Sequence, residues 1–88
     1  MILRAFSIHD VKAETFTPPF YQNTDGQATR VFQDLVNNPD HGIGKHPQDY
    51  TIFMVGTFDD NTGHFESISP ISLGNGVEFN QMPLPLKE

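Results

Sequence analysis

The sequence contains no cysteine, and this absence excludes a disulfide-stapled scaffold, a thiolate zinc site and a cysteine nucleophile. Basic residues are scarce, since five Lys and Arg stand against eleven Asp and Glu, for a formal net charge of −6. Long apolar runs are also missing. The longest covers only residues 52–55, so we expect no membrane partner.

The chain is nevertheless typical of a folded protein. Eight Phe and a charged share of only 18% argue against a disordered chain, which would combine low hydrophobicity with high charge. With 88 residues in all, we expect one small α+β domain at residues 1–80 and a frayed tail at residues 81–88.

The clearest local pattern predicts a helix over residues 24–37. Thr24 and Gln27 have the spacing of a capping box. Five apolar residues then recur at helical spacing, which gives one apolar stripe: Ala28, Val31, Phe32, Leu35 and Val36. The helix should end at Asn37 and Asn38, because the residue before Pro39 is disfavoured in the α region.

Three segments read as strands: residues 2–9, 50–58 and 64–69. Residues 59–63 form a hairpin loop that ends in a glycine, and Pro70 should stop the third strand. A weak fourth strand is expected at residues 77–79. The predicted fold is thus a small antiparallel sheet of three or four strands with one amphipathic helix on one face. The two most apolar strands, 2–9 and 50–58, should be adjacent at its centre.

One helix covers one face of a sheet, yet the strand at residues 50–58 is apolar on both faces. Two explanations remain open for the second face. Either residues 16–20, which contain two prolines, lie over it, or a second copy of the chain does so. In the second case we expect a homodimer whose interface includes some of Phe6, Tyr50, Phe53 and Val55.

No motif supports catalysis or a cofactor. His41 and His46 do not match a zinc spacing, residues 59–63 lack the glutamate of a calcium loop, and residues 42–45 are not set between a strand and a helix as a P-loop is. We therefore expect a protein that is not an enzyme and that holds no metal and no cofactor. If the chain binds DNA, we expect the cationic side chains of Lys12, Arg30 and Lys45 to contact it. Because acidic residues outnumber basic ones in this chain, we expect DNA binding to be weak.

Three stretches together resemble one family: residues 7–20 (SIHDVKAETFTPPF), 28–41 (ATRVFQDLVNNPDH) and 46–63 (HPQDYTIFMVGTFDDNTG). They are similar to the small nonstructural protein of gokushoviruses, single-stranded-DNA microviruses of bacteria, over about residues 2–79. The resemblance implies a non-enzymatic phage accessory protein in the host bacterial cytoplasm, acting in single-stranded DNA genome synthesis or packaging. Its contacts would be with single-stranded DNA or with a viral or host replication or assembly protein. The alternative is a protein–protein interaction module, a homodimeric adaptor or host-factor modulator, with no direct nucleic-acid binding.

Overall fold

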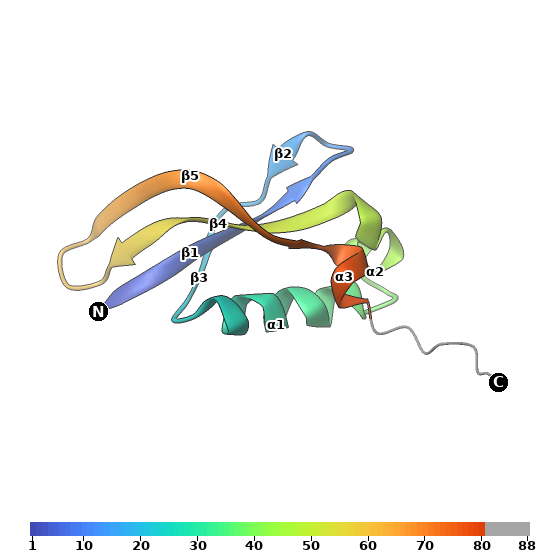
Figure 1. Cartoon of the computed structure of the whole chain (residues 1–88), viewed down its shortest axis with the longest axis horizontal. Coiled ribbons are helices and arrows are strands. Elements are labelled where there is room, and N and C mark those ends of the chain that lie inside the picture. The colour runs from blue at the N-terminus through green and yellow to red at the C-terminus, as the bar shows by residue number, and fades with distance from the viewer. Residues whose placement is uncertain (81–88) are drawn as a thin grey trace.

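The computed structural model describes residues 1–80. The fold is α+β, with a curled antiparallel sheet and helices packed against it (Figure 1). The elements of this part of the chain are β1 (Ile2–Asp10), β2 (Thr15–Phe16), β3 (Phe20–Gln22), α1 (Asp25–Val36), α2 (Gly42–Lys45), the 3₁₀ turn η1 (Pro47–Asp49), β4 (Tyr50–Asp59), β5 (His64–Asn75) and α3 (Gly76–Phe79).

The sheet has the strand order β2-β1-β4-β5, and β3 also pairs with β1. The two strands expected at the centre, β1 and β4, are adjacent as predicted, with partners running from Ile2 opposite Asp59 to Asp10 opposite Tyr50. Both strands are central in the sheet, because β1 pairs with β4 on one edge and with β2 and β3 on the other, and β4 pairs with β1 and β5. The strand β5 forms one edge of the sheet.

Helix α1 lies along one face of the sheet (Figure 1). Thr24 is its N-cap, as predicted, and its side-chain oxygen accepts a hydrogen bond of 3.1 Å from the Gln27 N–H. The Gln27 side chain reaches back to the N–H of Asn23 rather than to that of Thr24. Between helix and sheet lies a buried cluster that includes Ala28, Phe32, Val36, Phe6, Ile8, Ile52 and Met54.

Two expectations near the C-terminal part are wrong. Pro70 does not end the third strand, because it lies in a bulge of β5. Met54 pairs with Ile71 and Gly56 pairs with Ser67, so three residues of β5 lie opposite Val55 alone. Proline is tolerated at such a bulge since no ladder hydrogen bond is needed. Residues 77–79 belong to the short helix α3, whose N-cap Asn75 forms a capping box with Glu78. The expected tail, residues 81–88, lies outside the described residues.

Candidate functional site

The most distinctive surface is the sheet face opposite α1, which we call the outer face. It carries the rings of His9, Phe16, Tyr21, Phe53, Phe58 and Phe65. At one end Phe16 stands between two neighbours: its ring centroid is 4.6 Å from that of His9 and 5.5 Å from that of Phe53. Phe16 is nonetheless 48% exposed. Its ring is available to a ligand.

A second group of rings lies toward the β4–β5 hairpin. Tyr21 and Phe58 have ring centroids 5.6 Å apart, and Phe65 pairs with Phe58 across the sheet. The Phe65 ring lies over Gly56, where an added Cβ would stand only 3.0 Å from two ring carbons. Tyr21 is 40% exposed and Phe65 42%.

The rings share one face because β4 contains a bulge. Between Ala5 and Phe6 the partner on β4 shifts from Gly56 to Met54, so Val55 is an extra residue. Strict alternation would place Phe53 and Phe58 on opposite faces. The bulge reverses the alternation, and both rings reach the outer face.

The outer face carries no carboxylate among the described strands. Their three acidic residues are Asp10, Asp59 and Glu66, and all lie on the side of α1. Asp10 is opposite Tyr50, which packs against the core, while Asp59 and Glu66 line a hollow with Ile2. The carboxylates carried by the strands are therefore confined to the side of α1.

Residue 17 fixes the position of Phe16. The buried Ser7 hydroxyl donates a 2.6 Å hydrogen bond to the Thr17 carbonyl, and the Thr17 hydroxyl accepts a 3.0 Å bond from the Ile8 N–H. These bonds hold the segment between β2 and β3 against β1. Residues 16–20 were one of the two candidates for covering the second face of the sheet, and they cover part of it. Phe16 lies on the outer face, whereas Phe20 packs with Phe6 on the side of α1.

The four residues expected at an interface do not share a face. Phe53 lies on the outer face, and Val55 is the half-buried bulge residue. Phe6 is fully buried under α1, and Tyr50 packs against the same core. Burial, together with the nearby Asp10, raises the pKa of Tyr50. Phe6 and Tyr50 are thus corrected to core positions, because even-numbered β1 residues and their β4 partners face the helix.

The three cations expected to contact DNA are all exposed but occupy different elements. Lys12 lies in the turn joining the strands that carry His9 and Phe16. Arg30 is on α1, on the opposite side of the sheet from that turn (Figure 1), and Lys45 ends α2. Of the three, Lys12 is the one that borders the outer face. Sequence reasoning did not identify Phe16, Tyr21 and Phe65 as exposed rings or place Phe58 beside them, because face and exposure depend on the bulge and on strand pairing.

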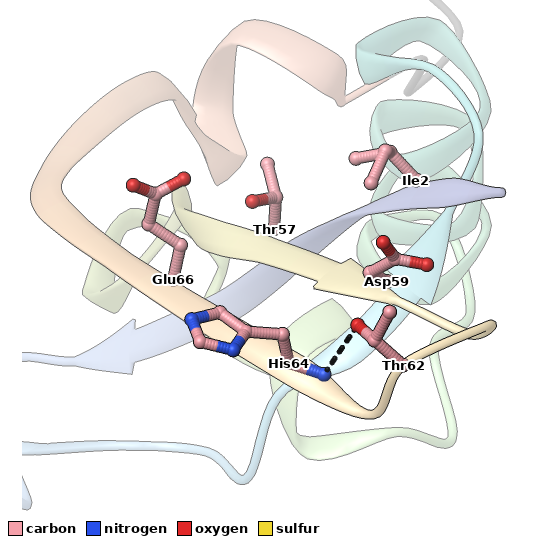
Figure 2. Close-up of a pocket in the computed structure, with 6 residues that line it drawn as sticks. All are labelled: Ile2, Thr57, Asp59, Thr62, His64 and Glu66. Carbon is pink, nitrogen blue, oxygen red and sulfur yellow. Dashed lines mark hydrogen bonds between the residues drawn. The ribbon is translucent and has the colours of Figure 1, made fainter.

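On the side of α1, the β4–β5 hairpin and the start of β1 enclose an open hollow of about 430 Å³ (Figure 2). It is lined by Ile2, Thr57, Asp59, Thr62, His64 and Glu66. The Asn61 N–H donates a 2.9 Å hydrogen bond to Asp59, and this bond lowers the pKa of the carboxyl group. Within residues 1–80, no three His, Asp or Glu side chains converge in a way that could hold a metal ion.

A family model described as Phage ORF5 protein matches residues 3–79. No curated protein and no solved structure matches the chain. Among residues 1–80, no helix has the length and apolar character needed to cross a membrane.

Proposed function

Because the chain belongs to the Phage ORF5 protein family, we propose that this small bacteriophage protein binds single-stranded DNA through the outer face during genome synthesis or packaging. It acts without catalysing a reaction, in the cytoplasm of the infected bacterium. The resemblance of residues 7–20, 28–41 and 46–63 to the gokushovirus nonstructural protein supports this role.

The observation that carries the proposal is the set of exposed rings on a face whose strands direct no carboxylate toward it. Phe16, Tyr21 and Phe65 are each at least 40% exposed, although aromatic side chains normally gain by burial. Bases of single-stranded DNA stack on such rings, and stacking does not depend on sequence because every base has a π-face. A net negative protein can use this mode where its acidic groups lie elsewhere.

The size of the patch also favours bases over a second protein. At roughly 200 Å² per aromatic side chain, the three most exposed rings offer about 260 Å². A stable protein–protein interface needs about 800 Å² from each partner. Individual bases need only the area of one ring each. The exposed rings therefore fit a few stacked bases better than a folded partner.

The cations contribute little in this arrangement. Non-specific binding to nucleic acids draws mainly on neutralised phosphates, and Lys12 is the expected cation that borders the rings. We therefore expect micromolar affinity with a shallow dependence on salt. Replacing Arg30 or Lys45 should change that dependence less than replacing Lys12.

A second candidate is supported by the excess of eleven carboxylates over five cations. In this case the outer face would contact a viral or host replication or assembly protein, and DNA would not be bound directly. Such binding would fall when apolar side chains are truncated. It would leave a DNA oligonucleotide free in solution.

The ring variants Phe16→Ala and Tyr21→Ala test the proposal. Titrating a labelled oligothymidylate and following its anisotropy should show a loss of about 1–3 kcal/mol per ring. Val31→Ala is the matched control, because Val31 is an exposed apolar residue on α1, away from the outer face. Wild-type protein that leaves the oligonucleotide unbound, or ring variants that bind as well as the control, would refute direct DNA binding and favour a protein partner.

A further inference from the structure

Within residues 1–80, the strand β5 leaves one edge of the sheet unpaired. It runs from His64 to Asn75, and residues 64–72 are all exposed. Its only strand partner among the described residues is β4. An edge strand directs the N–H and C=O of every second residue away from the sheet, where they can pair with another strand.

The usable part of this edge is its first half. Residues 68–70 form the irregularity opposite Val55, and Pro70 has no N–H to donate. Beyond it, α3 packs against the end of β5. Residues 64–67 pair regularly with β4 and lie at the end of β5 opposite to α3 (Figure 1). They carry one carboxylate, on Glu66, and one large exposed ring, on Phe65.

We propose that this edge pairs antiparallel with the same edge of a second copy of the chain, with Phe65 on the two-fold axis. A two-fold axis perpendicular to the sheet places each residue opposite one on the same face, so a single residue must lie on the axis. Centring on Glu66 would bring two carboxylates together, which is unfavourable. Centring on Ser67 would draw the irregular residues 68–70 into the ladder.

The register centred on Phe65 is self-complementary. Phe65 lies beside the partner's Phe65 on the outer face, so the two rings pack against each other at the axis while their outer surfaces stay open to solvent. On the opposite face His64 lies across from the partner's Glu66, and Glu66 lies across from the partner's His64. Figure 2 shows that both side chains extend from the same strand beside the hollow. Two such pairs per dimer, imidazole with carboxylate, explain why a second copy suits this edge better than an arbitrary extended peptide.

The dimer would join the two sheets into one, with the outer faces on the same side. It would give single-stranded DNA a platform continued from one copy to the next, and this part of the inference rests on the proposed function. The pairing itself does not depend on DNA. Because few residues pair, the contact is smaller than a standard interface and should form at high protein concentration.

The absence of natural cysteine allows a direct test. Residues directly opposite in an antiparallel pair have Cα atoms about 4.5–5.5 Å apart, which a disulfide can bridge. Under mild oxidation Phe65→Cys should become a disulfide-linked dimer. Ser72→Cys is the control, because Ser72 is exposed on the same strand but lies outside the paired segment. Equal cross-linking of the two variants would overturn the proposed register.

A charge exchange tests the same register without a covalent link. Glu66→Lys should weaken the dimer by about ten-fold, because each imidazole loses the carboxylate that faces it across the axis. The double variant His64→Glu, Glu66→Lys should restore it, and circular dichroism should show that both variants remain folded. Sedimentation equilibrium measures the dimer. A mass that stays at 9.9 kDa at millimolar concentration in the wild type, or a double variant as weak as Glu66→Lys, would refute the proposal. Neither result depends on whether DNA binds.

Discussion

Replacing Gly56 by alanine tests whether the outer-face rings are held as the structure has them. An added Cβ would stand 2.5 Å from the Glu66 carbonyl oxygen and 3.0 Å from two carbons of Phe65. The carbonyl belongs to the backbone of β5, so β4 and β5 would have to separate locally and the ring would be displaced. Overpacking of this kind costs about 1–3 kcal/mol.

The sign of this effect makes it a strict test. In the absence of a clash, Gly→Ala stabilises a folded protein by about 0.4–1 kcal/mol, because alanine loses less backbone entropy on folding. Gly26→Ala in α1 provides that reference, since its Cβ would meet nothing nearer than the Thr24 hydroxyl at 3.9 Å. Urea denaturation should give a lower midpoint for Gly56→Ala and a higher one for Gly26→Ala than for the wild type. A midpoint raised in both variants would refute the close packing of Phe65 on Gly56.

Three further predictions concern the core, the cap and the hairpin. Phe32→Ala should lower the free energy of unfolding by about 3–5 kcal/mol, because Phe32 is fully buried and its ring centroid lies 5.5 Å from that of Phe79. A loss under about 1 kcal/mol in urea denaturation would contradict this prediction. Thr24→Ala should cost about 1 kcal/mol by the same assay, since it removes the side-chain acceptor at the start of α1, and Thr24→Ser should retain most of the stability. The lowered pKa of Asp59 means that its carboxylate contributes stability above its ordinary pKa of 3.8, and that this contribution disappears as the pH falls through the lower value of the folded state. The stability difference between wild type and Asp59→Asn should therefore be present at pH 6 and shrink below pH 3.8 in thermal melts, and a difference independent of pH would contradict it.

Local signals in the sequence were sufficient for the main elements. The Thr24–Gln27 spacing and the apolar stripe defined α1 to within one residue at each end, because capping and burial both act within a few residues. The strands β1 and β4 were also predicted, together with their adjacency at the centre of the sheet. The helix could be predicted because its capping and apolar spacing are local in the sequence, and the two central strands because both are strongly apolar.

The sequence did not show which side chains share a face. Alternation groups Phe58 with Ile52 and Met54, yet the extra residue Val55 moves Phe58 to the outer face beside Tyr21. A bulge is fixed by the pairing of two strands, and no single-strand pattern reveals it. The same limit explains why Phe6 was expected at an interface: periodicity separates the two faces of β1 but does not say which one the helix covers.

The extent of β5 was missed for a similar reason. Pro70 normally ends a strand, but here it lies in an irregular stretch of three residues opposite one, where no donor is needed. The strand then resumes and leads into α3, which begins at the Asn75 cap. The long exposed edge on which the proposed dimer depends therefore became visible only in the structure.

The dependence of DNA affinity on salt tests the central claim, binding by stacking on the outer face, most directly. For single strands the logarithm of the binding constant falls with the logarithm of salt concentration by about 0.7 for each neutralised phosphate. Stacking with Lys12 as the bordering cation predicts micromolar binding of an oligothymidylate with a slope between zero and about −0.7. A slope of about −2, which requires Lys12, Arg30 and Lys45 to neutralise phosphates together, or no binding even at low salt, would contradict the account.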